Sequence, residues 1–152
     1  MSLLAAIRPD DFNWALLVHV AGAMVLIGGL LTSGGAMVLA RRDGTGTLAR
    51  FSFRTLAVVA LPGFIVMRVG AQWIYDKEGF AGDSDPTWIG IGFGTADVGA
   101  LLLLIALVLG AVGLRRSRRG DGDGLLRASG VIALVLLAAY VVAVWAMAGK
   151  PA

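Results

Sequence analysis

The sequence predicts an all-α membrane protein, a single-domain bundle of four transmembrane helices over residues 1–152. Two observations lead to this fold class. The composition is 58% hydrophobic with a mean hydropathy of +0.84, which is far more apolar than a soluble domain of this length. The chain also holds four apolar segments long enough to cross a bilayer as helices, which takes about 20 residues. We expect these spans at residues 13–40, 54–75, 88–114 and 127–148.

Basic residues are distributed unevenly between the predicted loops, and this orients the bundle. Nine arginines fall in loops 41–54 and 115–127, whereas the opposite ends of the spans carry three basic residues. Because basic loops stay cytoplasmic, we expect both termini and loop 76–87 outside, in a multi-pass protein of the cell membrane. The lipid bilayer is then the expected partner. Nucleic acid is not, because no basic domain of sufficient size exists to bind it.

The first span, residues 13–40, carries the only histidine of the chain, His19. An ionisable side chain inside a span is costly in hydrocarbon, which makes His19 the leading candidate for a functional residue. It lies on a stripe of mostly small residues, a pattern that lets membrane helices approach closely. The stripe comprises Ala15, His19, Gly22, Leu26, Gly29, Ser33 and Ala36. We therefore expect His19 to face the bundle, and we expect this long apolar run to be an uncleaved span.

The loops after the first and third spans share the pattern Leu-x-Arg-x-Ser, at residues 48–52 and 125–129. Two explanations stay open. A duplicated helical hairpin produces such a match at a constant offset. Short cytoplasmic turns also favour arginine, glycine and aspartate without any common origin.

The second span contains Pro62-Gly63 near its middle, followed by Arg68 and Gln72. Proline removes a backbone hydrogen bond, so we expect a kink there. Arg68 and Gln72 are four residues apart and therefore share one helix face.

The third span contains one carboxylate, Asp97, whose depth depends on where the helix begins. If the helix begins near Pro86, Asp97 lies well inside the span. If Thr95 caps the helix, Asp97 is a first-turn carboxylate that faces the helix dipole. The fourth span carries Tyr140 on one face with small and apolar residues.

Helical rise places these polar residues, one or two from each span, at a similar depth below the outer boundary. At 1.5 Å per residue, His19, Arg68 and Tyr140 lie about 9 to 12 Å deep, and Asp97 lies about 13 Å deep if its helix begins near residue 88. One interpretation is structural. Arg68 then pairs with Asp97, while His19, Gln72 and Tyr140 hydrogen-bond across helices to fix their register.

The other interpretation is a site that opens outward. His19 would bind a metal or haem or carry a proton, because neutral imidazole does each of these. Arg68 would bind an anionic group, oriented by Gln72 and Tyr140. A single histidine cannot ligate haem from both sides, so Met67, Tyr140 or a second subunit would complete the site. Copper held by His19 and methionines is a further chemical option.

Residues 17–23, LVHVAGA, followed by Gly28-Gly29, resemble the first-helix pattern of the bacterial copper-resistance D (CopD)-like group. Pro62-Gly63 with Gly70 is similar to the second helix of the small members of that group. The resemblance implies a four-helix bundle with an intramembrane histidine linked to haem or copper. It also extends, more distantly, to HemJ-type protoporphyrinogen oxidases. The sequence departs from the pattern at Leu26-Ile27, where the group often has tryptophan before Gly-Gly.

Three functions follow as expectations. The preferred one is a small membrane module whose site binds a haem-like group or copper, or serves in transport. The site residues are His19, Arg68, Gln72, Asp97 and Tyr140, with His19 as the metal ligand. The second is a HemJ-like porphyrinogen oxidase. The third is a non-catalytic accessory subunit of a larger membrane complex, and a homo-oligomer is equally compatible with the sequence.

Overall fold

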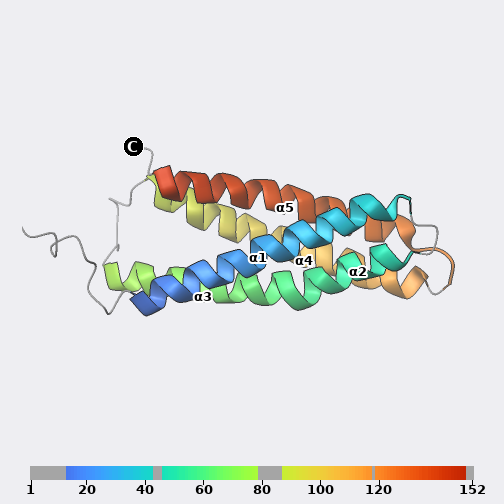
Figure 1. Cartoon of the computed structure of the whole chain (residues 1–152), viewed down its shortest axis with the longest axis horizontal. Coiled ribbons are helices and arrows are strands. Elements are labelled where there is room, and N and C mark those ends of the chain that lie inside the picture. The colour runs from blue at the N-terminus through green and yellow to red at the C-terminus, as the bar shows by residue number, and fades with distance from the viewer. Residues whose placement is uncertain (1–12, 43–45, 79–86, 118, 150–152) are drawn as a thin grey trace, which may run out of the picture.

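The computed structural model describes residues 13–42, 46–78, 87–117 and 119–149. These residues form long helices that run side by side along one axis (Figure 1). Four of the helical segments are long and apolar enough to cross a membrane. The predicted all-α, four-helix membrane fold is confirmed, and the protein is a multi-pass membrane protein. The helices are α1 (Asn13–Ala40), α2 (Thr47–Thr55), η3 (Leu56–Ala60), α3 (Leu61–Glu78), α4 (Thr87–Ser117) and α5 (Asp123–Gly149).

The helices extend beyond the predicted spans. The second span was expected to begin at residue 54, but α2 already begins at Thr47, so most of the predicted loop 41–54 is helical. This first part is amphipathic, which hydropathy alone does not detect: it buries Ala49 and Ser52 and exposes Arg50.

The start of α4 decides the depth of Asp97. The helix begins at Thr87, so Asp97 lies ten residues inside it, about 15 Å from its start. The alternative in which Thr95 caps the helix is wrong.

A π-helical turn, η3, joins α2 to α3 directly before Pro62. The N–H of Leu61 donates to the carbonyl of Leu56, the i→i+5 bond that defines such a turn. Proline has no N–H, and its ring crowds the carbonyl four residues earlier. The wider turn therefore occupies the stretch where Pro62 disturbs regular α-helical bonding, and the sequence signal at Pro62-Gly63 corresponds to this irregularity.

Glycines allow the backbone of α1 to pack directly against the backbone of η3 and α3. A Cβ atom on Gly63 would lie 2.6 Å from the backbone nitrogen of Leu26, and one on Gly29 would lie 2.8 Å from that of Ala60. Such close approach is the usual basis of helix association in membranes, where burial of apolar surface gives little driving force. The small-residue stripe predicted on α1 is therefore its packing face.

The buried face of α4 repeats that of α1 at a constant offset. Ala15, Gly22 and Leu26 are buried on α1, and the residues 77 positions later (92 − 15, 99 − 22, 103 − 26) are buried on α4. The same holds for the rest of the stripe: Gly29, Ser33 and Ala36 correspond to Ala106, Gly110 and Gly113. The same offset separates the two Leu-x-Arg-x-Ser motifs, as a duplicated hairpin predicts. Because 77 is a multiple of seven and packed helices bury residues at three- and four-residue spacing, unrelated helices share such an offset too, so both explanations stay open. The bundle consists of one hairpin of α1 with α2–α3 and one of α4 with α5.

Two serines join α1 to α2 near the turn of the first hairpin. The Ser52 hydroxyl donates to the Ser33 carbonyl at 2.8 Å, and the two hydroxyl oxygens lie 3.1 Å apart. Both side chains are buried, so neither has water as an alternative partner.

We expect Ser52→Ala to lower the free energy of unfolding by about 1 kcal/mol, because it removes these bonds and leaves the Ser33 hydroxyl without its partner. Unfolding in detergent by heat or denaturant measures the effect. Ser117→Ala is the control, since the Ser117 hydroxyl donates to the Leu114 carbonyl within its own helix. Equal stability of the two variants would contradict this role for Ser52.

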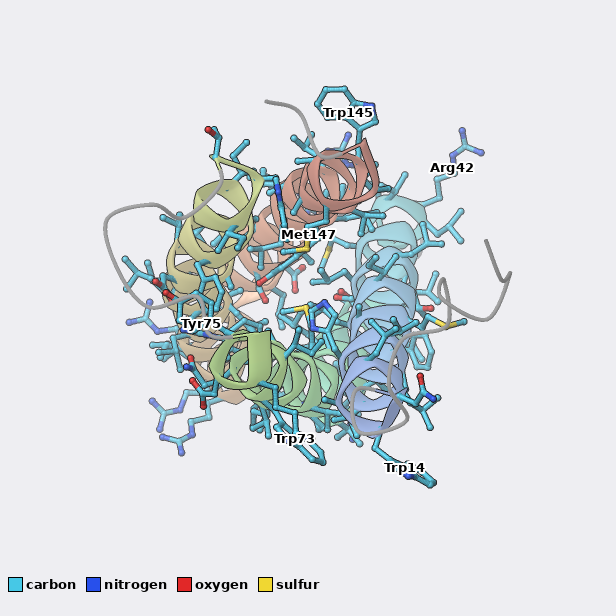
Figure 2. The ribbon with its side chains drawn as sticks, turned by 90° about the vertical axis from the view of Figure 1, so that its left-hand side faces the viewer. Trp14, Arg42, Trp73, Tyr75, Trp145 and Met147 are labelled. Carbon is cyan, nitrogen blue, oxygen red and sulfur yellow. The ribbon has the colours of Figure 1, made fainter. Side chains whose placement is uncertain are left out.

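The two ends of the bundle differ. At the end where the arginines gather, α1 packs directly on α5, because a Cβ on Gly130 would overlap Met37 and one on Gly34 would overlap Leu134. The opposite end, where α1 and α4 begin and α3 and α5 end, is named the His19 end here (Figure 1). Trp14, Trp73 and Trp145 point outward around it (Figure 2), as expected for tryptophans at a membrane interface.

Candidate functional site

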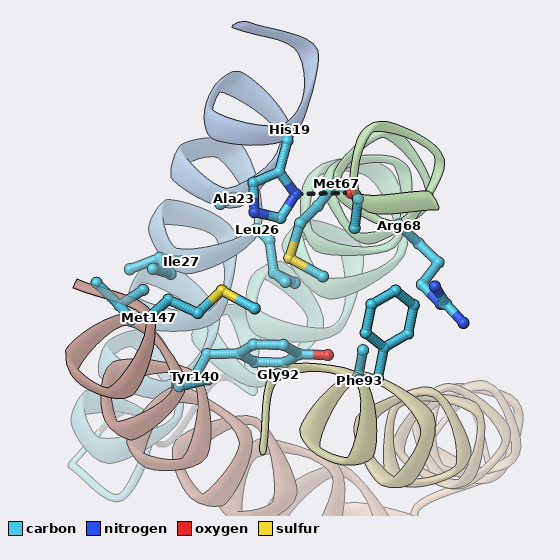
Figure 3. Close-up of a pocket in the computed structure, with 14 residues that line it drawn as sticks. His19, Ala23, Leu26, Ile27, Met67, Arg68, Gly92, Phe93, Tyr140 and Met147 are labelled. Atoms are coloured by element: carbon cyan, nitrogen blue, oxygen red, sulfur yellow. Dashed lines mark hydrogen bonds between the residues drawn. The ribbon is translucent and has the colours of Figure 1, made fainter. Parts of the chain in front are cut away.

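A cavity of about 490 Å³ opens between the two hairpins at the His19 end. Its walls come from α1, α3, α4 and α5. The lining is mostly aliphatic and aromatic, and its polar side-chain groups belong to His19, Tyr75 and Trp88. A second cavity of about 60 Å³ adjoins it deeper in the bundle and shares His19, Phe93 and Met147 with it (Figure 3). The larger volume is within the range of small-molecule sites in proteins, about 300 to 1,000 Å³.

His19 is half-buried and lines both cavities. Its Nδ1 lies 3.0 Å from the backbone carbonyl of Met67 on α3 (Figure 3). A carbonyl only accepts, so Nδ1 carries the proton, and in the neutral ring Nε2 keeps its lone pair. Gly70 makes this placement possible, because a Cβ there would lie 2.5 Å from the backbone nitrogen of His19. The imidazole is thus held from one side and presents Nε2 to the cavities.

Tyr140 of α5 crosses the floor of the smaller cavity (Figure 3). Its side chain is only 5% exposed, and its hydroxyl has no hydrogen-bond partner among the described residues. The absence of a side chain at Gly99 gives this hydroxyl room against α4, since a Cβ there would overlap it. A buried hydroxyl without a partner costs about 1 to 3 kcal/mol, so a hydrogen bond from a bound molecule would be favourable once a shift of the Tyr140 ring turns its hydroxyl from Gly99 toward the cavity.

Arg68 contributes to the wall of the smaller cavity, but its guanidinium points away from His19 (Figure 3). The guanidinium carbon lies 4.6 Å from the centre of the Phe93 ring, a cation–π contact. On the outer surface Nη2 pairs with Asp97 at 3.5 Å. Phe93 in turn packs edge-on against Tyr75, with ring centres 5.2 Å apart, so aromatic rings lie between the charged pair and the cavity.

Gln72 belongs to the outer group as well. Its side-chain oxygen accepts from Arg68 at 3.5 Å, as the four-residue spacing indicates, and its amide donates to Asp76 at 2.9 Å. Gln72 and Asp97 line neither cavity.

The predicted polar layer therefore divides into two groups. Arg68, Gln72 and Asp97 form a polar ladder on the outside of α3 and α4, while His19 and Tyr140 lie inside the bundle. The expected Arg68–Asp97 pair is confirmed. Of the expected bonds across helices, that of His19 is found, to the Met67 carbonyl of α3. The expectation is wrong for Gln72 and Tyr140, since Gln72 bonds within α3 and the Tyr140 hydroxyl has no partner among the described residues.

The cavity also holds groups that sequence reasoning set aside or missed. Met67 and Met147 bring thioethers to the smaller cavity beside His19 (Figure 3), although methionines at helical spacing usually serve packing. Phe93, which separates Arg68 from the interior, gave no sequence signal, because it lies in the glycine-rich start of α4. Among the described residues, no group of three or more histidine and acidic side chains could hold a metal ion.

Comparison of the chain with protein-family models, with curated proteins and with solved structures finds no match. The resemblance of residues 17–23 to the CopD-like group accordingly stays a prediction, and the function is argued from the site.

Proposed function

We propose that this protein binds a small, largely apolar molecule with one polar end in the cavity between its two hairpins. The observation that carries the proposal is the Nε2 of His19, an acceptor that faces both cavities, together with the Tyr140 hydroxyl, which is buried without a partner among the described residues beside the smaller one. A ligand hydroxyl can donate to Nε2 of His19, whereas a ligand carbonyl can accept only from the Tyr140 hydroxyl. Most of the remaining lining is aliphatic or aromatic and would take the body of the molecule.

The route to the cavity supports a ligand that dissolves in the membrane. Leu16, Val20 and Met24 of α1 line the cavity and are also exposed on the outside of the bundle, as is Val144 of α5. The cavity therefore reaches the lipid-facing surface between α1 and α5. With the arginine-rich loops in the cytoplasm, the His19 end lies on the outer side, and the ligand enters from the outer leaflet.

Haem or copper is the second candidate, favoured by the bonding of His19. Ligand histidines almost always donate their second N–H to a carbonyl, carboxylate or water, and Nδ1 of His19 does so to Met67. The thioethers of Met67 and Met147 are soft donors, of the kind that serve as a further ligand of haem iron or bind copper(I). The donor atoms present thus fit copper(I) or a haem iron, but the described lining offers no cation turned inward to pair with haem propionates. Bound haem would supply the redox chemistry that a HemJ-like oxidase requires. Arg68 does not serve this site, because its guanidinium is turned outward to Asp97.

Tyr140→Phe tests the proposal because it should lower ligand occupancy without lowering the stability of the ligand-free protein. Without ligand the variant is expected to be as stable as the wild type or more so, because it removes a buried hydroxyl that has no partner. Ligand occupancy after purification should fall about tenfold, because one hydrogen bond to the ligand is lost. Native mass spectrometry measures occupancy, and thermal unfolding of the delipidated protein measures stability.

The control is Ser129→Ala, which deletes a buried hydroxyl from the same helix at the arginine-rich end. It should leave occupancy unchanged. If Tyr140→Phe keeps full occupancy and destabilises the ligand-free protein, the hydroxyl has a structural role and the proposal fails. A wild-type protein that carries no ligand at all would favour the accessory-subunit function.

A further inference from the structure

The outer surface of α3 and α4 carries charges inside the membrane-spanning segments. The side chains of Arg68 and Asp97 are 31% and 68% exposed, and each lies ten residues inside its helix, which corresponds to about 9 to 13 Å below the expected outer boundary. Charged side chains at such depth normally face protein or a water-filled cavity. The Arg68–Asp97 pair instead lies on the outside of this bundle, on the far side of Phe93 from the cavity. A single chain therefore leaves this surface incompletely covered.

The same surface admits a close helix. Gly90 and Gly94 are exposed on α4, and a Cβ atom on either would meet no atom within 4 Å. Counting along the helix, Gly90, Gly94, Asp97 and Leu101 follow one another at intervals of four, three and four residues, so they share one exposed face. A helix that crosses α4 at the two glycines would approach its backbone and bring its own polar groups beside Asp97.

We propose that this surface, formed by Arg68, Gly90, Gly94 and Asp97, is a dimer interface with a second copy of the chain. The charges favour this partner: Arg68 and Asp97 lie side by side, so the pair is complementary to a second copy of itself, while Asp76 bonds to Gln72 at the outer end of the same ladder. A twofold axis along the membrane normal places two parallel α4 helices together and brings Arg68 toward the partner's Asp97. Each carboxylate then lies between two guanidiniums, and both charges leave the lipid. This inference does not depend on what the cavity binds.

Single-molecule fluorescence of labelled protein in lipid vesicles tests the interface, because photobleaching steps count subunits and energy transfer reports pairing. The wild-type chain is expected to dimerise. Gly94→Leu should weaken the dimer at least about tenfold by blocking close approach of α4. The matched control is Gly28→Leu, since Gly28 is an exposed glycine on α1 that likewise has nothing within 4 Å, and it should leave the dimer unchanged.

Charge exchange gives a second test that does not depend on packing. Chains with Arg68→Asp or with Asp97→Arg should each fail to dimerise alone, because like charges then meet across the axis. A mixture of the two should form mixed pairs, since one chain contributes two carboxylates and the other two guanidiniums. The double variant, with both changes in one chain, restores the pair within the chain and should dimerise with itself.

Three outcomes would overturn the proposal. The wild type could stay monomeric at every protein-to-lipid ratio, or the dimer could form equally well with Gly94→Leu. In the third outcome, a mixture of Arg68→Asp and Asp97→Arg chains pairs no better than either variant alone. If lipid or an unrelated subunit covers this surface instead, the wild type will stay monomeric.

Discussion

Replacement of His19 by alanine is expected to empty the cavity. Nε2 of His19 is the only unprotonated nitrogen that the cavity walls offer, and no neighbouring side chain can replace it. Loss of one hydrogen bond to an apolar ligand would lower affinity about tenfold, and loss of an iron or copper ligand by far more, at least about a hundredfold. The fold should survive, because the Met67 carbonyl that His19 contacts lies within α3.

An absorption spectrum of the purified protein, elemental analysis for copper and native mass spectrometry together separate the candidates. A Soret band that His19→Ala removes identifies haem, copper lost in the variant identifies a metal site, and a colourless ligand lost in the variant identifies the apolar molecule. Leu17→Ala is the control, because Leu17 is exposed on α1 two residues away and lines neither cavity. Full ligand retention by His19→Ala would exclude every function assigned to this cavity.

The fold followed from the sequence because one physical constraint dominates it. A helix must carry apolar residues over the whole thickness of a bilayer, and runs of that length are conspicuous in any sequence. The packing face of α1 was also predictable, since small residues at helical spacing indicate close approach. The extension of the second span to Thr47 was not, because amphipathic turns outside the hydrocarbon leave no strong hydropathy signal.

The candidate site was only partly predictable, because depth along a helix is easier to obtain from sequence than direction around it. His19, Arg68 and Asp97 do lie at comparable depths, as the helical rise indicates. Whether each side chain points inward depends on the rotation of its helix about its own axis. His19 points inward and contacts the carbonyl of Met67, whereas Arg68, the next residue along α3, points outward to Asp97. The backbone carbonyl that fixes the His19 tautomer leaves no trace in the sequence at all.

Gly22→Ala adds a single methyl group, and we expect it to destabilise the bundle more than other substitutions that add one methyl group. A methyl group at Gly22 would collide with the backbone of Met67 and Val66, and no side-chain rotation relieves a clash with backbone. The helices α1 and α3 must separate, which also disturbs the contact of His19 with the Met67 carbonyl. We expect a loss of about 3 kcal/mol or more in the free energy of unfolding, at the upper end for overpacked interiors, together with reduced ligand occupancy.

Gly28→Ala provides the matched comparison, because it makes the same chemical change in the same helix. Gly28 is exposed, and a Cβ there meets nothing within 4 Å, so alanine should leave stability unchanged or raise it by up to about 1 kcal/mol through its greater helix propensity. Unfolding of both variants in one detergent measures the difference. Equal stabilities would mean that α1 and α3 are not in backbone contact, and the placement of His19 against Gly70 and Met67 would then be wrong as well.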